Sequence, residues 1–522
     1  MLKRITAQIR KTAESRPVFL AAALFVLALS ARLYYASQKE TFHHDEVIGY
    51  LAATVNQEHY FTNGLRDRWV RNSEWLTIFD IGENRYNFKK IQQDLVEYDM
   101  HPPLYFWLLH TAVCQTGISL FLNSLINIFF FSASFWMLYA ICRRVFTGHG
   151  WPACAMLIWA LSPVTISTTV FIRQYEMLGT FALAAVLILL VYFKSAVRGR
   201  AVCATLYALC ILGGMMTAYQ FSLHIASLSL LVFLYFLRSR NWKHIAIIAG
   251  VTLAGLALYF LAHPSFFSEV SRGTAGHFSA DRFGERFSRT VYTIGKFFPF
   301  RIGTLILLVL VNIFSIFQLK PDHVFRPAED TCSGRLMPST CILVVLASNT
   351  ALFLFMYLSF KFPKNAMNIE QFSFIWPFFA VLFTYCIMRL DPKLAIRSAA
   401  VPVTVFLLGT VFGHVSYIGE LDIHHLNGRS EPYAFRFDFN MRGHIARFLY
   451  HMPPDSLMYV PSSYKTDAEE LLRSGREADF KHTLFYILRQ DDAIKRFSEN
   501  EALEKMKIAG FTAFTPKIQD GN

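Results

Sequence analysis

The amino-acid sequence predicts a polytopic α-helical membrane protein, and three observations support this prediction. Of the 522 residues, 54% are hydrophobic, 16% are aromatic and only 17% are charged, whereas about a quarter of the residues are charged in an ordinary soluble domain. Several apolar stretches of about 20 residues are long enough to cross a hydrocarbon core of about 30 Å. Clusters of Lys and Arg separate alternate stretches. A simple soluble enzyme, a disordered chain and a disulfide scaffold are therefore excluded.

About eleven transmembrane helices are expected from these stretches. They lie near residues 17–36, 120–141, 151–168, 175–193, 201–219, 221–237, 245–262, 297–318, 339–359, 372–388 and 398–417. The first is expected to be a retained helix rather than a cleaved signal peptide, because bulky Arg32, Tyr34 and Tyr35 follow its apolar run where a cleavage site needs small residues. The apolar segment 102–117 is expected to be an interfacial or re-entrant helix, because a crossing there would move the later Lys and Arg clusters outside.

The positive charges predict the orientation of the chain. Six segments that face the cytoplasm when the N-terminus is inside hold 19 Lys and Arg in 67 residues, and the short loops on the opposite side hold 7. Because cytoplasmic loops carry the excess of Lys and Arg, we expect a cytoplasmic N-terminus and an extracytoplasmic C-terminus. The net charge of +13 then reflects topology, and no nucleic-acid partner is expected.

Two polar segments on the outer face are too long to be simple connections. Residues 37–101 form the first external loop of a transmembrane domain that spans 1–417, and 418–522 form a C-terminal extracytoplasmic domain. This domain alternates short apolar runs with helical patterns, which is typical of a small α/β unit. The apolar runs are Leu457–Val460, Thr483–Leu488 and Phe511–Phe514, and a helical pattern covers Asp491–Ile508.

An acid pair follows the first predicted transmembrane helix. Asp45 and Glu46 close the sequence Thr-Phe-His-His-Asp-Glu, and carboxylates this near an apolar boundary are costly unless they are paired or functional. One interpretation is that these residues cap the next helix, Val47–Asn56, because acids are favourable in a first helical turn. The other is that a partly desolvated Asp acts as a general base or metal ligand.

A second cluster, Tyr98–Tyr105, closes the same loop. Its two prolines are explained by a helix that begins there, since Pro is tolerated in a first turn. They do not explain why Asp99 and His101 lie together at the mouth of a membrane helix.

A third cluster lies at the outer turn between the third and fourth helices. Arg173 and Tyr175 follow a Ser-Pro pair at Ser162. An Arg at a membrane boundary can extend to water, or it can bind an anionic group. Weaker candidates on the outer loops are Arg272, Arg282, Lys361, Lys364, His263, His277, His414, His424 and His425.

Five motifs occur in one order: the acid pair, His-Pro-Pro-Leu-Tyr, Arg-Arg-Val-Phe, Leu-Ser-Pro and Arg-x-Tyr. Together they resemble the membrane glycosyltransferases of the GT-C superfamily, family 39/83 type, which includes protein O-mannosyltransferases and lipid A aminoarabinose transferases. The matched stretch runs from about residue 17 to 195. The resemblance implies a GT-C fold, a multi-pass location in a bacterial inner (plasma) membrane and a polyprenyl-phosphate sugar donor.

The resemblance also implies roles for individual residues. Asp45, with Glu46 beside it, would take the proton from the acceptor as the acceptor attacks the anomeric carbon with inversion, and Asp99 is a further catalytic candidate. His101, Arg173 and Tyr175 would bind the donor phosphate, whose developing charge needs fixed cations.

A divalent metal stays unassigned. Aminoarabinose transferases carry a metal-binding Glu where this chain has Met100, so the chain departs from their pattern at that position. Asp99, one residue away, and His44 are the candidate ligands.

Two other functions stay open at this point. A transporter or flippase of a lipid-linked saccharide would need charged residues in mid-membrane and related halves. A structural or assembly protein would not need so many helices. The acceptor can be a lipid, a polysaccharide or a protein, and membrane lipids are the other expected partners.

Overall fold

The computed structural model describes most of the N-terminal half of the chain and several parts of the C-terminal half. The described residues are 17–62, 65–146, 150–238, 240–274, 373–388, 403–411, 415–416, 433–437, 445–449, 452–461, 483–488, 491–500, 503–508 and 511–516. The chain divides into two compact units, and each is described by itself. We name them the helical unit (1–37, 100–105 and 124–416) and the loop–sheet unit (38–99, 106–123 and 417–522).

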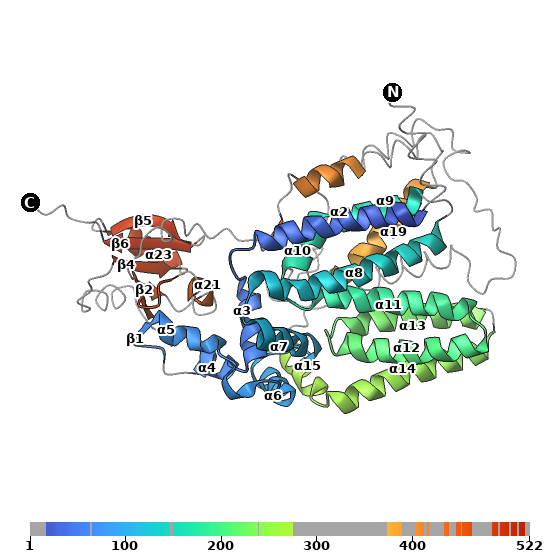
Figure 1. The fold of residues 1–522 in the computed structure, drawn as a ribbon. Coiled ribbons are helices and arrows are strands. Elements are labelled where there is room, and N and C mark those ends of the chain that lie inside the picture. The colour runs from blue at the N-terminus through green and yellow to red at the C-terminus, as the bar shows by residue number, and fades with distance from the viewer. Residues whose placement is uncertain are drawn as a thin grey trace, which may run out of the picture. The chain divides into compact units, whose positions relative to one another are not determined.

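Helices, most of them apolar, form the described part of the helical unit (Figure 1). They are α2 (Pro17–Ser37), α8 (Leu120–Val145, which belongs to this unit from Ser124 onward), α9 (Gly150–Ala160), α10 (Pro163–Val170), α11 (Tyr175–Lys194), α12 (Val197–Met215), α13 (Phe221–Arg238), α14 (Trp242–Ala262), α15 (Phe266–Thr274) and α19 (Trp376–Met388). Among the described residues, five helices are long and apolar enough to cross a membrane, or six if a bent pair is one span. The chain is therefore a multi-pass membrane protein.

Most of the predicted spans coincide with these helices. The span predicted at 201–219 is helix α12, which begins and ends four residues earlier. The span predicted at 151–168 is broken into α9 and α10, which are bent by 56°. The break lies at Ser162-Pro163, because Pro lacks the N–H that a continuous helix needs and disfavours a helical residue before it. Pro163 is the first residue of α10.

Three predicted spans extend beyond the described residues. The spans at 297–318 and 339–359 lie outside them altogether, and of the span at 398–417 a helical stretch at 403–411 is described. The total of about eleven helices stays a prediction.

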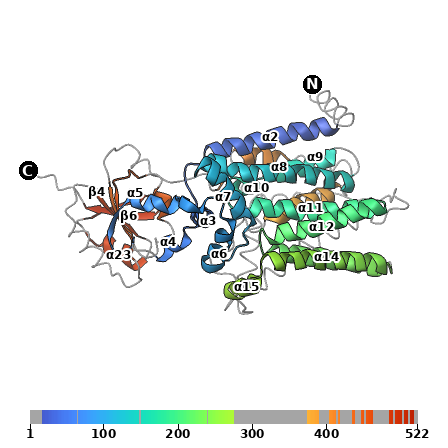
Figure 2. The same cartoon turned by 60° about the horizontal axis from the view of Figure 1, so that its bottom comes forward.

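Helices α11, α12 and α14 lie side by side in the helical unit (Figures 1 and 2). Gly255 allows α14 to approach α12 closely, because a Cβ built there would lie 2.9 Å from Cβ of Ile211 and 3.0 Å from the carbonyl oxygen of Ala208. Small residues at such crossings let membrane helices pack against each other without an intervening side chain. Gly250 on the same helix has nothing within 4 Å of its Cβ position.

The loop–sheet unit contains short helices and a sheet. Its elements are α3 (His44–Thr54), α4 (Gln57–Thr62), β1 (Trp69–Arg71), α5 (Asn72–Trp75), η1 (Leu76–Phe79), η2 (Gly82–Asn84), α6 (Phe88–Tyr98), most of α7 (Leu104–Thr116), β2 (Tyr433–Phe437), α21 (Ala446–Leu449), β3 (Leu457–Tyr459), β4 (Thr483–Leu488), α23 (Asp491–Ser498), β5 (Leu503–Ile508) and β6 (Phe511–Pro516). Helix α7 supplies the helix expected at 102–117, and its membrane position stays a prediction.

The six described strands form one mixed sheet in the order β1-β3-β2-β4-β6-β5. Strand β2 is parallel to both β3 and β4, and the other pairs are antiparallel. The edge strand β1 comes from the first loop and pairs with β3, so that Val70 lies opposite Met458. Asn72, directly after β1, donates from its side chain to the carbonyl oxygens of Leu449 and Met452 at 3.0 and 2.9 Å. The first loop and the C-terminal segment thus share one sheet.

The predicted C-terminal elements agree with the structure except at one place. Strands β3 and β4 match the runs at 457–460 and 483–488, and β6 contains the run at 511–514. The helix predicted over Asp491–Ile508 is wrong in its second half, since the helix ends at Ser498 and strand β5 begins at Leu503. Residues 503–508 pair along their whole length with β6, so the sheet overrides a helical propensity.

The close crossing of α12 and α14 generates a prediction. Replacing Gly255 with Leu should lower the thermal midpoint of the purified protein in detergent, because overpacking a tight contact costs about 1–3 kcal/mol. Gly250→Leu adds the same side chain to the same helix where there is open space, and it should leave the midpoint within error. Equal effects of the two substitutions would contradict the packing described here.

Candidate functional site

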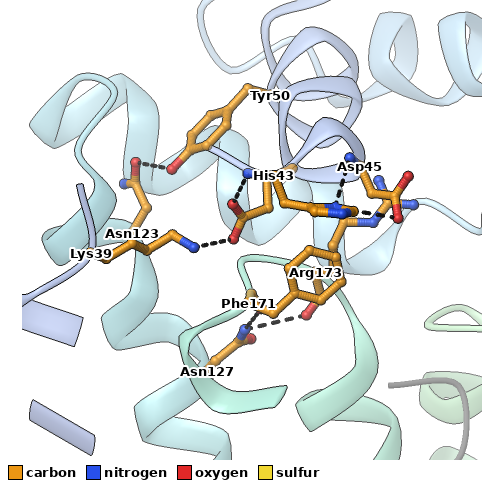
Figure 3. A network of polar contacts seen from close by, with 9 residues as sticks. Lys39, His43, Asp45, Tyr50, Asn123, Asn127, Phe171 and Arg173 are labelled. Carbon is orange, nitrogen blue, oxygen red and sulfur yellow. Dashed lines mark hydrogen bonds and ion pairs between the residues drawn. The ribbon is translucent and has the colours of Figure 1, made fainter. Parts of the chain in front are cut away.

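The acid pair lies at the N-terminus of α3, where it was predicted. His43 is the N-cap, and its Nδ1 accepts from the backbone N–H of Asp45 at 3.3 Å. The backbone N–H of His43 donates to Oε2 of Glu46 at 2.7 Å, which completes a capping box (Figure 3). A capping box satisfies N–H groups that a helix end would otherwise leave without partners. The interpretation of this sequence as a helix start is therefore confirmed.

Glu46 is fully engaged in this local structure. Its second carboxylate oxygen, Oε1, lies 2.8 Å from Nζ of Lys39, and both side chains are fully buried. A buried carboxylate is tolerated when it is both paired with a cation and hydrogen bonded. Glu46 therefore ties the segment before α3 to the first turn of that helix.

Asp45 has different surroundings from its neighbour. Its side chain is 33% exposed, and its Oδ2 lies 3.7 Å from Nδ1 of His43. The carboxylate is held at a defined helix end and is also partly open to solvent. A group that must reach a substrate proton needs this combination of fixed position and access.

Asp99 ends α6 as its C-cap, with its backbone N–H bound to the carbonyl oxygen of Leu95 at 3.0 Å. Its side chain is half-buried. The sequence placed Asp99 at the start of the following helix, but that helix begins five residues later at Leu104. The two prolines at 102 and 103 precede α7 rather than lie inside it, since each lacks the N–H that a helix interior requires.

Asp94 is a functional candidate that the sequence analysis did not find. Its side chain is buried on α6, and burial raises the pKa of its carboxyl from 3.8 to about 7. The nearby acids Glu58, Glu97 and Asp99 raise this pKa further, while a hydrogen bond from the backbone N–H of Gln57 lowers it.

The sequence did contain a signal for Asp94. Ile91 and Leu95, which α6 buries together with it, occupy the same face at helical spacing. An acid on the apolar face of an amphipathic helix is unusual.

The predicted phosphate-binding residues His101 and Arg173 lie together in the helical unit. Nη2 of Arg173 lies 3.3 Å from Nε2 of His101, and Arg173 is only 3% exposed. Arg173 lies in the turn between α10 and α11, where its backbone N–H bonds to the carbonyl oxygen of Phe171 at 2.7 Å. The segment after His101 is held by the backbone N–H of Leu104, which donates to the carbonyl oxygen of Met216 at 3.0 Å.

Asn127 on α8 holds the same turn from another side. Its Nδ2 donates to the carbonyl oxygen of Phe171 at 2.5 Å and to that of Arg173 at 3.3 Å (Figure 3). Asn127 is itself fully buried. Sequence reasoning missed this residue, because Asn123 and Asn127 in a mostly apolar span belong to no recognised motif.

Tyr175, the third predicted phosphate ligand, begins α11. Its ring stacks on Phe171 with centroids 6.0 Å apart and an interplanar angle of 8°. Its carbonyl oxygen accepts from Oγ of Ser373 at 2.8 Å. The described contacts place the ring against the turn that carries Arg173.

The described residues do not bring together three or more His, Cys, Asp or Glu side chains that could hold a metal ion. His44 and Asp99 therefore do not belong to a metal cluster within the part of the chain that the structure describes, and we derive no step through a metal. Among the weaker candidates, His263 is buried and lies 3.2 Å from the carboxylate of Glu269. Outside the described residues lie Arg282, Lys361, Lys364, His277, His414, His424 and His425.

Comparison with solved structures identifies proteins of the same fold. A crystal structure of ArnT from Cupriavidus metallidurans bound to undecaprenyl phosphate matches with a TM-score of 0.52 and 12% sequence identity, covering 96% of this chain and 98% of that one. The apo structure of the same protein matches with a TM-score of 0.51 and 12% identity over 95% and 97% of the two chains. No protein-family model and no curated protein matches the sequence. This chain therefore shares its fold with these proteins over nearly its whole length, as the resemblance in the sequence predicts.

The buried carboxyl of Asp94 generates a prediction of pH dependence. The folded pKa of this carboxyl, about 7, lies above the ordinary value of 3.8. The folded protein should therefore lose stability progressively as the pH rises from about 4 to about 7, because the buried carboxyl must then ionise. Asp94→Asn keeps an acceptor for Gln57 and removes the charge. It should raise the thermal midpoint by about 2–4 °C at pH 8, and by less at pH 5.

The exposed acid Glu83 provides the matched control for this measurement. Glu83→Gln should change the midpoint little, and equally at pH 5 and pH 8. An Asp94→Asn variant that is no more stable than the unmodified protein at pH 8 would show that the burial of this carboxyl is not costly.

Proposed function

We propose that this protein is a glycosyltransferase. It transfers a sugar from a polyprenyl-phosphate-linked donor to an acceptor hydroxyl or phosphate at the outer face of a bacterial inner (plasma) membrane, with the N-terminus in the cytoplasm and residues 418–522 outside. The observation that carries the proposal is the contact between buried Arg173 and half-buried His101, whose nitrogens lie 3.3 Å apart at a turn between two membrane helices. Such a cationic group at the end of apolar helices fits a ligand with an anionic head and an apolar tail.

The fold supports the same chemistry. ArnT, which has this fold along nearly the whole chain, binds undecaprenyl phosphate in its crystal structure. A lipid of this kind needs helices that its tail can lie between and a polar end where its phosphate can be bound. The helical unit supplies the apolar helices, and the turn between α10 and α11 supplies the polar end.

Arg173, with His101 and Tyr175, is assigned to the donor phosphate. A guanidinium can donate two parallel hydrogen bonds to phosphate oxygens, and these bonds are strong where water is excluded. Arg173 is almost fully buried, so the surrounding protein holds its guanidinium in one place before the donor arrives. When the sugar leaves, negative charge grows on the phosphate, and a fixed cation stabilises that charge in the transition state.

Asp45 is assigned as the general base. It removes the proton from the acceptor hydroxyl as the acceptor oxygen forms its bond to the anomeric carbon. The bond between that carbon and the phosphate oxygen breaks on the opposite side, so the configuration inverts, and free polyprenyl phosphate leaves with the bonding electrons. The partly exposed carboxylate of Asp45 is suited to this proton transfer.

The other two acids receive distinct roles. Glu46 is assigned to hold the start of α3 rather than to contact the acceptor, because Lys39 and the backbone of His43 occupy its two oxygens. Asp99 is the second carboxylate proposed for the acceptor. The identities of the sugar and of the acceptor are left open by these assignments.

A base that acts on the acceptor predicts the effect of one substitution. Asp45→Asn should reduce transfer by at least about 100-fold, since a positioned base contributes about 100- to 10,000-fold, and the protein should stay folded and inserted. The measurement is mass spectrometry of glycolipids and glycoproteins from cells that lack the protein, complemented with each variant. Asp80→Asn, an exposed acid of the same loop, should restore the missing product fully, and full restoration by Asp45→Asn would refute the assigned role.

A cation that binds the phosphate predicts a different effect at Arg173. Arg173→Ala should raise KM for the sugar-lipid donor about tenfold or more, because a charge-assisted contact to phosphate is lost, and Arg173→Lys should recover part of it. Release of free polyprenyl phosphate by the purified protein is the readout, and neither a flippase nor an assembly factor would release it. Arg198→Ala, an exposed arginine at the start of α12, is the control that should leave KM unchanged.

A further inference from the structure

Helix α2 carries a fully buried arginine that the proposed chemistry does not use. Arg32 lies five residues before the end of α2 and is 0% exposed. Its Nη1 donates to the carbonyl oxygens of Ala28 at 3.1 Å and Ala160 at 2.8 Å. Its guanidinium carbon lies 3.4 Å from the centroid of the Phe131 ring. A charged side chain inside an apolar span is costly, and in most membrane proteins it marks a functional region.

The remaining donors of Arg32 are directed to helix α10. Nη2 donates to Oγ1 of Thr165 at 3.3 Å, and Nε donates to Oγ1 of Thr169 at 3.1 Å. Both threonines are buried. Arg32 therefore connects α2 to both turns of α10, the short helix that follows the break at Ser162-Pro163.

Thr169 extends this connection across the next turn of the chain. Its Oγ1 lies 3.1 Å from Oε2 of Glu176 and 2.9 Å from the carbonyl oxygen of Thr165, and these two acceptors share its one proton. Glu176 is buried in the first turn of α11. Thr169 is the penultimate residue of α10. The bond thus joins a residue before the turn at 171–174 to a residue after it, and Arg173 lies in that turn.

The surroundings of Glu176 do not offer a ligand site of its own. A small polar cavity beside it is lined by Ser134, Thr165, Thr168 and Ser373 among others. The cavity has room for about one water molecule, which is too little for a sugar or a phosphate. The carboxylate of Glu176 consequently has a structural partner on the Arg32 side and at most a water on the other.

We propose that Arg32 is a positioning residue, which acts through Thr169 and Glu176 to hold the turn between α10 and α11 so that Arg173 presents its guanidinium to the donor phosphate. This inference rests on the proposed function of Arg173. Asn127 holds the carbonyl side of the same turn, and the Arg32–Thr169–Glu176 chain holds its two ends. The buried charge of Arg32 is thus linked to the turn that carries Arg173 through Thr169 and Glu176.

Thr169 is the best position for the test, because Thr and Val have nearly the same shape and the variant should fold. Thr169→Val removes the hydroxyl and with it the contacts to Arg32, to Glu176 and to the carbonyl oxygen of Thr165, whereas Thr169→Ser keeps them. Thr168→Val removes a neighbouring hydroxyl, which among the described residues donates within its own helix, to the carbonyl oxygen of Val164 at 2.9 Å. Binding of undecaprenyl phosphate to the purified full-length protein is measured for each variant, alone and combined with Arg173→Ala.

We expect Thr169→Val to weaken binding about threefold to tenfold, since hydrogen bonds to charged groups are lost. Thr169→Ser and Thr168→Val should bind as the unmodified protein does. In the Arg173→Ala background the effect of Thr169→Val should disappear, because the two residues then act on one contact. A purely structural role for Arg32 and Thr169 would lower the thermal midpoint without this coupling.

Three results would overturn the inference, and they are distinguishable. If Thr169→Val binds within twofold of the unmodified protein, the positioning role is wrong. If its effect is the same with and without Arg173, Thr169 acts on some other part of the protein. If Arg173→Ala itself leaves the affinity unchanged, the proposed phosphate site is wrong, and the positioning role fails with it.

Discussion

The helical unit depends on one constraint: a polar group inside a membrane has no water to bond and must find its partner within the protein. The break between α9 and α10 shows the consequence. A Pro at this position removes a backbone donor and interrupts the helix, which frees carbonyl groups that need new partners. Arg32 is one such partner, because it donates to the carbonyl oxygen of Ala160, the last residue of α9. The buried charge and the broken helix satisfy each other, and each would be costly alone.

The same constraint explains why the turn at residues 171–174 can be rigid. The turn is short and buried, so its carbonyl groups cannot rely on water, and Asn127 takes up two of them. A turn held in this way presents Arg173 with little freedom. A cation fixed before its ligand arrives stabilises developing charge without reorganising. The polar residues inside apolar spans, which look like defects in a hydropathy pattern, are therefore the parts of the unit most directly connected to the proposed chemistry.

The sequence predicted the parts of the fold that are determined by composition along the chain. Apolar runs predicted α2, α8, α11, α13 and α14 within a few residues, because an apolar run of membrane length has few other structures open to it. Pairings between distant segments were not predictable in this way. Strand β1 is only three residues long and has no pattern of its own. Nothing in the sequence therefore indicated that it would join a sheet whose other strands all lie in the C-terminal segment, from Tyr433 onward. The end of helix α23 was missed for the same reason, because β5 takes its form from β6.

For the site, the sequence found the right residue types but could not assign their roles. Asp45 and Glu46 are adjacent acids, and a motif treats them as a pair. Successive residues on a helix point about 100° apart, so one can be buried while the other is open, and only the partners decide which. Lys39 and the His43 backbone take both oxygens of Glu46, and a carboxylate bound in this way would have to break a buried ion pair to accept a proton. The side chain of Asp45 is 33% exposed, which is why the base is assigned to the more exposed member of the pair.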